Sequence, residues 1–373
     1  METVNMNKIP FFFILGRPRS GTTLLKMLFD AHPNVKIPPE LPVFLPLYQK
    51  FRRVKHWDRE HLLAFIDHVF CPGIFRNRIS ETLKINREKF TEDLLKMAND
   101  CTIQDLLVKL NEHSHSIFPK DRILIAGDKN PVYSVYMKRL IQIFPKAWFI
   151  CIIRDYRDNY ISLKNLGEVI LEAPVLTLQI ARWVYVTKLF LSCQDRYPDR
   201  FYIIRYEDLV TNPGETVREL CAFLGIPFNP VVFDFYLRRE ELMATFPSPE
   251  IRRIHRSLME PVNTGRMDLW KSRLTPLEVR IADQIAGKTA DAMGYKRETT
   301  KFSLSLYFRS LPMVLYGRIL FRLMQWGSLM PYRCSRWLSM NIPRLLSVYR
   351  RFSEKSAVSD ISEISSKDKQ DER

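Results

Sequence analysis

The stretch FFFILGRPRSGTTLLKML, residues 11–28, decides the fold of this chain. A hydrophobic run leads to a turn at Gly16 and a second glycine at Gly21, and an apolar-periodic segment follows. That order predicts a strand, a phosphate-binding loop and a helix. The loop of nucleotide hydrolases has a lysine where this chain has Thr22, so the cation of the loop is Arg19 instead.

The rest of the chain continues the alternation of strand and helix. Short apolar runs rich in β-branched and aromatic residues predict buried parallel strands at Phe11–Leu15, Ile123–Ala126, Trp148–Ile153 and Phe201–Ile204. Helical patterns lie at Thr22–Asp30, Val132–Ile143, Tyr156–Leu166, Ala173–Arg196, Glu215–Leu224 and Pro276–Met293. We expect an α/β fold, a P-loop-type parallel β-sheet flanked by helices, with a helical insertion after the first βα unit and a helical C-terminal extension.

Changes in composition predict three parts. Residues 1–297 form the main domain, with a mostly helical insertion at 41–120. Residues 298–353 form a basic amphipathic extension, in which residues 301–352 hold nine Lys/Arg and no Asp/Glu. Interleaved basic and aromatic residues suit the surface of an anionic membrane, and packing of these helices on the domain is the alternative. The polar residues 354–373 predict a disordered tail.

Charge and cysteine content limit the class of protein. A net charge of +16 favours an anionic partner, which is a nucleotide, a nucleic acid or an acidic membrane surface. The six cysteines are scattered and predict neither a disulfide framework nor a zinc site. The sequence has neither a secretory signal nor an uncharged apolar stretch of ~20 residues. We therefore expect a cytoplasmic protein that contacts a membrane only peripherally.

The glycine loop predicts an anion site whatever the class of enzyme. Backbone N–H groups and the N-terminus of the following helix attract a phosphate. Side-chain donors are added by Arg17, Arg19, Ser20, Thr22 and Thr23. The missing lysine, and the position of Asp128 beside Lys129, argue against a Mg²⁺-dependent ATPase or GTPase. We expect a site built from cations, without a metal.

Two motifs resemble the sulfotransferases that use 3′-phosphoadenosine 5′-phosphosulfate (PAPS). Arg19-Ser20-Gly21-Thr22-Thr23 is similar to their 5′-phosphosulfate loop. CIIRDYRDNYIS supplies Arg154 and, eight residues later, Ser162, as in their 3′-phosphate motif. The resemblance covers about residues 10–297, is closest in kind to the group that includes the tyrosylprotein sulfotransferases, and implies PAPS as the donor.

Two later segments extend the resemblance. Tyr206, which opens the sequence YEDL, is implied to lie near the adenine, and a packing tyrosine after a strand is the alternative. The segment NTGRMDLWKSRL resembles the loop that covers the nucleotide. It implies Arg266 and Lys271 as donor ligands, and which of the two contacts the nucleotide stays open.

The resemblance also implies catalytic residues. The base of the similar enzymes is a glutamate shortly after a D-A-H-P sequence, which implies Glu40 here. Lys129 in GDKNP matches the lysine that contacts the transferring group, and Arg19 holds phosphate and sulfate oxygens. His32 is the rival base, because cytosolic members use a histidine, although a His-Pro step more often ends and packs a helix.

The residues after Glu40 bear on the acceptor. Pro42 stands where the tyrosylprotein enzymes have an arginine suited to acidic peptides. The neighbouring apolar residues are Leu41, Val43, Phe44, Leu47, Tyr48 and Phe51. They predict a pocket for a small hydrophobic alcohol, such as a sterol, steroid or lipid, and ordinary core is the alternative.

Other functions stay open at this point. A carbohydrate or tyrosyl acceptor is the alternative within the family. A P-loop kinase would share the loop and the sheet, and a non-catalytic anion-binding protein would share the charge. Nucleic acid is not expected as a partner, because no nucleic-acid-binding module is visible.

Overall fold

A computed structural model describes residues 9–71, 79–166, 174–246, 249–332 and 334. Backbone contacts divide the chain into two compact units. The first consists of Met1–Arg154 and Val186–Met267, and the second of Asp155–Tyr185 and Asp268–Arg373. The predicted domain boundaries at 297 and 353 stay predictions, and the predicted tail at 354–373 lies outside the described residues.

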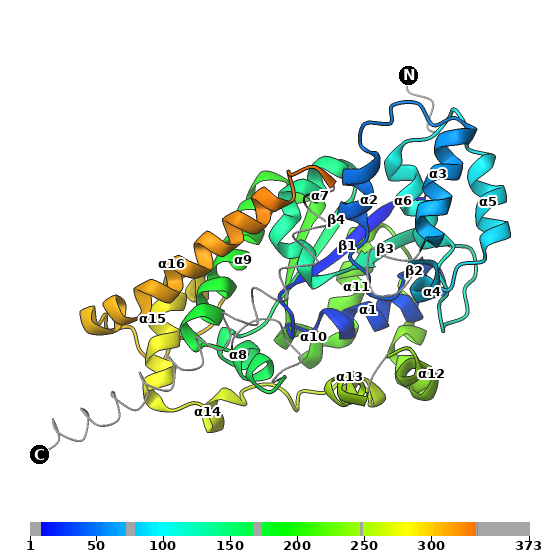
Figure 1. The fold of residues 1–373 in the computed structure, drawn as a ribbon. Coiled ribbons are helices and arrows are strands. Elements are labelled where there is room, and N and C mark those ends of the chain that lie inside the picture. The colour runs from blue at the N-terminus through cyan, green and yellow to red at the C-terminus, as the bar shows by residue number, and fades with distance from the viewer. Residues whose placement is uncertain (1–8, 72–78, 167–173, 247–248, 333, 335–373) are drawn as a thin grey trace, which may run out of the picture. The chain divides into compact units, whose positions relative to one another are not determined.

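The first unit contains a parallel five-stranded sheet (Figure 1). Its strands are β1 (Phe11–Gly16), β2 (Val35–Lys36), β3 (Ile125–Lys129), β4 (Trp148–Ile153) and β5 (Phe201–Arg205). Their spatial order is β2-β3-β1-β4-β5, so β1 lies at the centre. The run Phe12–Leu15 is completely buried, as expected for a strand covered on both faces. The predicted α/β fold class is confirmed.

Two strands differ from the prediction. The edge strand β2 was not predicted, because two residues are too few for a periodic pattern. β3 begins two residues late and continues to Lys129, because Ile14 pairs with Lys129 in the register with β1. Asp128 and Lys129 therefore lie inside the strand rather than in the turn after it.

The predicted insertion is helical. Its helices are α2 (Phe44–Phe51), α3 (Arg59–Phe70), α4 (Ile79–Leu83), α5 (Arg87–Leu95) and α6 (Ile103–Glu112). α6 begins with a capping box in which Thr102 and Asp105 satisfy each other's backbone N–H groups. At its other end, the buried Asn111 donates a 2.9 Å hydrogen bond to the Gly127 carbonyl. α6 is thereby attached to the strand that carries Lys129.

The remaining helices of the first unit connect and cover the strands. They are α1 (Thr22–Ala31), η1 (Pro131–Tyr136), α7 (Met137–Ile143), η3 (Pro198–Arg200), α10 (Tyr206–Thr211), α11 (Pro213–Leu224), η4 (Pro230–Arg238), α12 (Arg239–Ala244), α13 (Pro249–Ile254) and η5 (Arg256–Met259). The helix predicted at Val132–Ile143 is divided into η1 and α7. The tighter 3₁₀ turn buries consecutive residues, Tyr133 and Ser134, and both bond to other segments of the unit.

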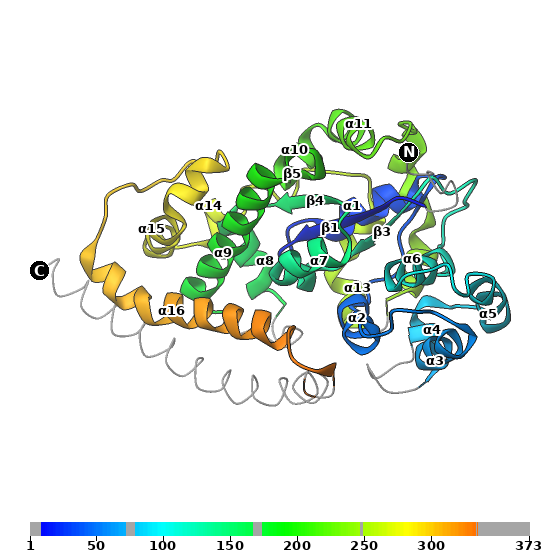
Figure 2. The ribbon, with the colours of Figure 1, turned by 90° about the horizontal axis from the view of Figure 1, so that it is seen from above.

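The second unit is helical. It contains α8 (Tyr156–Lys164), the first half of α9 (Leu176–Arg196), α14 (Trp270–Arg273), α15 (Pro276–Ala292) and α16 (Leu304–Gly327). The start predicted for α9, at Ala173, lies outside the described residues. Figure 2 shows α16 as one long helix beside α9. Among the described residues, no helix combines the length and the apolar character needed to cross a bilayer.

Candidate functional site

The glycine loop between β1 and α1 is fixed by two contacts. At its start, the Gly16 N–H donates to the Ser134 hydroxyl, which donates back to the Gly16 carbonyl, both at 3.0 Å. At its end, Gly21 has a φ of 96°, and a side chain there would meet the ring of Tyr206 at 2.5 Å. Only glycine tolerates both the positive φ and the close approach of the Tyr206 ring. The loop can therefore lead into the N-terminus of α1, where backbone N–H groups can bind an anion.

Three arginines from different segments line one pocket beside this loop. Arg19 comes from the loop, Arg154 follows β4, and Arg266 lies near the end of the first unit. Arg154 donates to the backbone carbonyls of Arg19, at 3.2 Å, and of Arg266. Arg19 donates to the Ile254 carbonyl at 3.3 Å. The other lining residues are Gly21, Thr22, Thr23, Leu24, Tyr206, Ile254, His255, Ser257, Leu258, Pro261, Val262 and Asn263.

The pocket is electrostatically suited to an anion. Burial, and then the charges of Arg266 and Arg154, lower the pKa of Arg19 to about 10. Cations that destabilise one another in this way are stabilised by a bound phosphate or sulfate, whose oxygens accept charge-assisted hydrogen bonds. The structure thus brings together Arg19 and Arg154, which the sequence assigned to the two ends of one nucleotide.

Tyr206 connects these arginines to the loop. Its ring lies 4.8 Å from the guanidinium carbon of Arg154 and packs over Gly21. The side chain is buried and also lines the pocket. It is therefore a packing residue at the pocket, and its contact with adenine stays a prediction.

Lys129 joins the loop to Glu40. The Lys129 side chain is only 4% exposed, and its Nζ donates to Thr23 Oγ1 at 3.3 Å. The same ammonium forms an ion pair with Glu40, whose side chain is 46% exposed. A solvent-accessible carboxylate, a buried cation and a hydroxyl of the pocket thus form one chain of contacts. The structure brings together the predicted base and the predicted lysine.

The carboxyl group of Asp128, next to Lys129, is buried and has a raised pKa. Burial, and then the charge of Glu40, raise the pKa of Asp128 to about 8. Its carboxyl group is therefore mostly protonated at pH 7. Within the described part of the chain, no group of three or more His, Cys, Asp or Glu residues is placed to hold a metal ion.

His32 has a structural role. It is completely buried, its Nδ1 accepts from the Asn34 N–H at 3.1 Å, and its Nε2 lies 2.8 Å from the Pro227 carbonyl. These partners require the tautomer that is protonated on Nε2. Both ring nitrogens are therefore occupied, and the interpretation of His32 as a residue that ends and packs α1 is favoured over a catalytic base.

Four predicted donor ligands do not line this pocket. Arg17 and Ser20 are buried elsewhere in the loop. Ser162 lies on α8 and Lys271 on α14, both in the second unit. The Nζ of Lys271 forms an ion pair with Asp268 at 3.1 Å. Their roles as ligands stay predictions. Of the two candidates in the segment NTGRMDLWKSRL, Arg266 lines the pocket and Lys271 does not.

His255 is a residue of the pocket that the sequence did not reveal. It follows α13, and its ring stacks on Phe246 with 4.6 Å between centroids and 9° between planes. Burial, and then the cations Arg19, Lys129 and Arg266, lower its pKa to about 3. His255 is therefore neutral at pH 7. A lone histidine among basic residues in RRIHRS carries no periodic or spacing signal, so no pattern could have identified it.

Most of the apolar segment after Glu40 belongs to the core. Val43, Phe44, Leu47 and Phe51 are almost completely buried, whereas Leu41 and Tyr48 are partly exposed. Phe44 packs against the ring of Tyr133, and its backbone N–H donates to the Tyr133 hydroxyl at 3.0 Å. Ordinary core, the alternative interpretation, therefore accounts for the four buried residues, which leaves Leu41 and Tyr48 as the residues that support a hydrophobic acceptor pocket.

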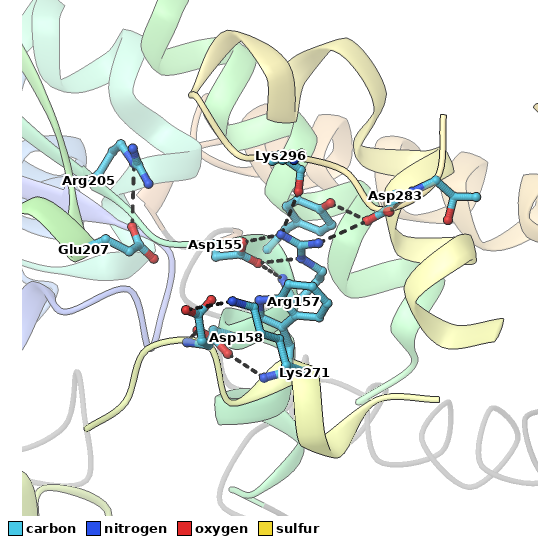
Figure 3. A network of polar contacts seen from close by, with 12 residues as sticks. Asp155, Arg157, Asp158, Arg205, Glu207, Lys271, Asp283 and Lys296 are labelled. Atoms are coloured by element: carbon cyan, nitrogen blue, oxygen red, sulfur yellow. Dashed lines mark hydrogen bonds and ion pairs between the residues drawn. The ribbon is translucent and has the colours of Figure 1, made fainter. Parts of the chain in front are cut away.

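A second cluster of buried charges holds the second unit together (Figure 3). The Arg157 guanidinium makes a bidentate contact with Asp155, at 3.1 and 2.7 Å, and lies 3.6 Å from the Trp270 ring centroid. It also donates to the Lys296 carbonyl and lies 3.6 Å from Asp283. These contacts connect α8, α14 and α15, so the cluster is structural.

The chain is similar to several known proteins. A model described as Sulfotransferase family matches residues 10–230. Protein-tyrosine sulfotransferase 1 of Danio rerio is 26% identical over 293 residues, which are 77% of this chain and 72% of that protein. The protein-tyrosine sulfotransferase of Drosophila melanogaster is 26% identical over 285 residues, which are 75% of this chain and 50% of that protein. This chain thus spans half the length of the second relative.

Among solved structures, the sulfotransferase domain from the curacin biosynthetic pathway aligns with a TM-score of 0.48 and 21% identity. The alignment covers 78% of this chain and 99% of that one.

Proposed function

This chain belongs to the sulfotransferase family, and from that premise we propose that it transfers the sulfuryl group of PAPS to the phenolic hydroxyl of a tyrosyl residue. Membership confirms the predicted family and the predicted class of enzyme. Relatives named protein-tyrosine sulfotransferases support the tyrosyl acceptor, which was the alternative to a hydrophobic alcohol. The burial of Val43, Phe44, Leu47 and Phe51 weakens the case for a hydrophobic alcohol.

The donor fits the cations of the pocket. Arg19, Arg154 and Arg266 would hold phosphate and sulfate oxygens, and Thr22 and Thr23 would add hydroxyl donors. The lowered pKa of Arg19, caused by burial and by the two other arginines, supports an anionic ligand at this place.

The chemistry needs a base for the acceptor hydroxyl and a cation for the charge that develops on the leaving phosphate oxygen. Glu40 takes the proton of the acceptor hydroxyl while the acceptor oxygen forms a bond to sulfur. The bond from sulfur to the bridging phosphate oxygen breaks, and the ammonium of Lys129 stabilises the charge that develops. One observation carries this proposal: Lys129 contacts both Glu40 and Thr23 of the phosphate loop.

The variant Glu40→Gln tests the base. We expect transfer from PAPS to a tyrosyl peptide to fall by about 10²–10⁴-fold, as for loss of a general base, with the affinity for 3′,5′-adenosine diphosphate unchanged. Glu112→Gln is the matched control. Glu112 forms an ion pair of 2.6 Å with Lys109, and neither residue lines the pocket. Full transfer by Glu40→Gln would remove Glu40 from the role of base.

A panel of acceptors tests the substrate class. Labelled donor is offered with an acidic tyrosyl peptide, its neutral counterpart, a steroid alcohol and a carbohydrate. We expect the peptides to be labelled. Labelling of the steroid or the carbohydrate alone would reject the tyrosyl acceptor while leaving the donor site intact.

A chelator separates the remaining alternatives. Transfer by the mechanism above continues without Mg²⁺, whereas a P-loop kinase needs Mg²⁺ and consumes ATP. A non-catalytic anion-binding protein would bind 3′,5′-adenosine diphosphate and transfer nothing to any acceptor of the panel.

A further inference from the structure

The helix α16 in the second unit exposes a continuous apolar face. Its members share a helical spacing and are between 44% and 69% exposed. They are Leu304, Phe308, Leu315, Ile319, Leu323 and Trp326. Isolated exposed apolar residues are ordinary, but a row of six over about six turns of one helix is not. We call these six residues the α16 face.

The opposite side of the helix is already covered. Phe321 is buried, with its ring 4.8 Å from that of Tyr185 and 4.7 Å from the Arg182 guanidinium carbon. Gly317 comes so close to α9 that an added Cβ would lie 3.0 Å from Leu178. The helix is therefore held on the second unit by one side, and the α16 face points away from that contact.

The charged side chains of α16 are all positive. At about 100° per residue, Arg318 and Arg322 fall on one edge of the face and Arg309 on the other. All three are exposed, and no Asp or Glu occurs from residue 299 to residue 353. Two copies of this face would bring like charges together, so self-association is electrostatically disfavoured.

We propose that the α16 face binds the surface of an anionic lipid bilayer, with its apolar side chains at the acyl boundary and its arginines among the headgroups. An apolar strip between cationic edges is the arrangement that such surfaces bind. Arginines near an anionic surface each add to the attraction, which weakens with salt. This inference does not depend on the acceptor or on the donor site.

Vesicle sedimentation with the full chain tests the proposal. Phosphatidylcholine vesicles with phosphatidylserine are expected to bind the protein, and vesicles of phosphatidylcholine alone to bind it far less. The double variant Ile319→Gln/Leu323→Gln is expected to lower the partition coefficient by about tenfold or more, because it removes apolar area from the bilayer boundary. Leu237→Gln is the control, since Leu237 is 69% exposed in the first unit.

A charge variant tests the headgroup contact. Arg318→Gln/Arg322→Gln is expected to weaken binding by about fivefold for each arginine. Arg280→Gln/Lys288→Gln removes the same charge from the exposed surface of α15 and should change binding much less. Transfer to a soluble acceptor stays unchanged in all four variants, which separates this proposal from the function of the pocket.

Three results would overturn the proposal. The first is equal binding to neutral and anionic vesicles. The second is an equal loss of binding in the control variants. The third is a concentration-dependent dimer, detected by sedimentation velocity, that Ile319→Gln/Leu323→Gln dissociates, because the α16 face would then be an interface between two copies.

Discussion

Arg19 in the pocket and Arg157 in the second unit are both buried, but their surroundings affect their charge in opposite ways. For Arg19, burial lowers the pKa, and the neighbouring Arg266 and Arg154 lower it further. For Arg157, burial also acts to lower the pKa, but the hydrogen bond and charge of Asp155, with Asp283, outweigh it and raise the pKa. One guanidinium is surrounded by cations and the other by carboxylates.

The difference separates a binding site from a structural cluster. A buried charge is costly unless opposite charge lies close to it. The protein itself supplies that charge around Arg157, so the cluster stabilises the fold without a ligand. In the pocket, the charges that lower the pKa of Arg19 are those of two arginines. An anionic ligand is therefore stabilised more strongly in the pocket than beside Arg157. Substitutions in the two regions should therefore have different consequences.

The largest effect on stability is expected for Arg157→Ala. It leaves the buried carboxylates of Asp155 and Asp283 without their cation, which costs about 3–5 kcal/mol of the free energy of unfolding. Urea denaturation measures this loss, and Arg157→Lys, which keeps the charge but not the bidentate contact, should lose less. A wild-type midpoint for Arg157→Ala would show that the cluster does not hold the second unit together.

The largest loss of donor binding is expected for Arg154→Ala. Loss of a charge-assisted phosphate contact, about 1.5–3 kcal/mol, lowers kcat/KM for PAPS by about 10–10²-fold, and the affinity for 3′,5′-adenosine diphosphate should fall with it. The loss of stability should be smaller than for Arg157→Ala, since removing Arg154 also relieves repulsion on Arg19. Steady-state kinetics and calorimetry check both. If Arg154→Ala unfolds as readily as Arg157→Ala, the two regions do not differ as argued.

Sequence patterns, together with the family resemblance, could predict the parts of the site that lie next to strands. Arg19, Lys129 and Arg154 each follow or end a strand that an apolar run reveals, and parallel strands bring their carboxyl ends to one edge. The same patterns gave the α/β fold and the helical insertion. Glu40 came from a family resemblance, because a glutamate in a loop has no physical signature in the sequence.

Two features could not be predicted. The wall of the pocket from Ile254 to Asn263 is built from short turns without periodicity, so neither its place nor His255 was visible. The apolar segment from Val43 to Phe51 was uncertain for another reason. A run of apolar residues looks the same in a sequence whether it lines a pocket or fills a core, and only packing shows that it fills the core.

A smaller effect is expected for Tyr206→Leu. The variant removes a ring 4.8 Å from the Arg154 guanidinium carbon, a contact of about 0.5–2 kcal/mol in buried sites. The KM for PAPS should rise by about three- to tenfold with little change in kcat, because Arg154 is less well positioned. Tyr206→Phe keeps the ring and should stay close to wild type. A large loss in Tyr206→Phe would indicate that the hydroxyl group, rather than the ring beneath Arg154, is what the pocket requires.

A further effect is a pH dependence of stability that comes from His255. Its pKa is lowered to about 3 in the folded chain, by burial and by Arg19, Lys129 and Arg266, against about 6.5 when unfolded. Below about pH 6.5 the His255 imidazole takes up a proton in the unfolded chain but stays neutral in the folded chain. The free energy of unfolding therefore falls as the pH falls.

His255→Gln should therefore lose less stability than wild type between about pH 7 and pH 5, as measured by thermal unfolding at each pH. Bound 3′,5′-adenosine diphosphate should reduce the difference, because its phosphates offset the cations that keep His255 neutral. Parallel pH profiles for the two proteins, with and without nucleotide, would mean that the arginines of the pocket do not act on His255. The contrast with the Arg157 cluster would then rest on hydrogen bonds rather than on charge.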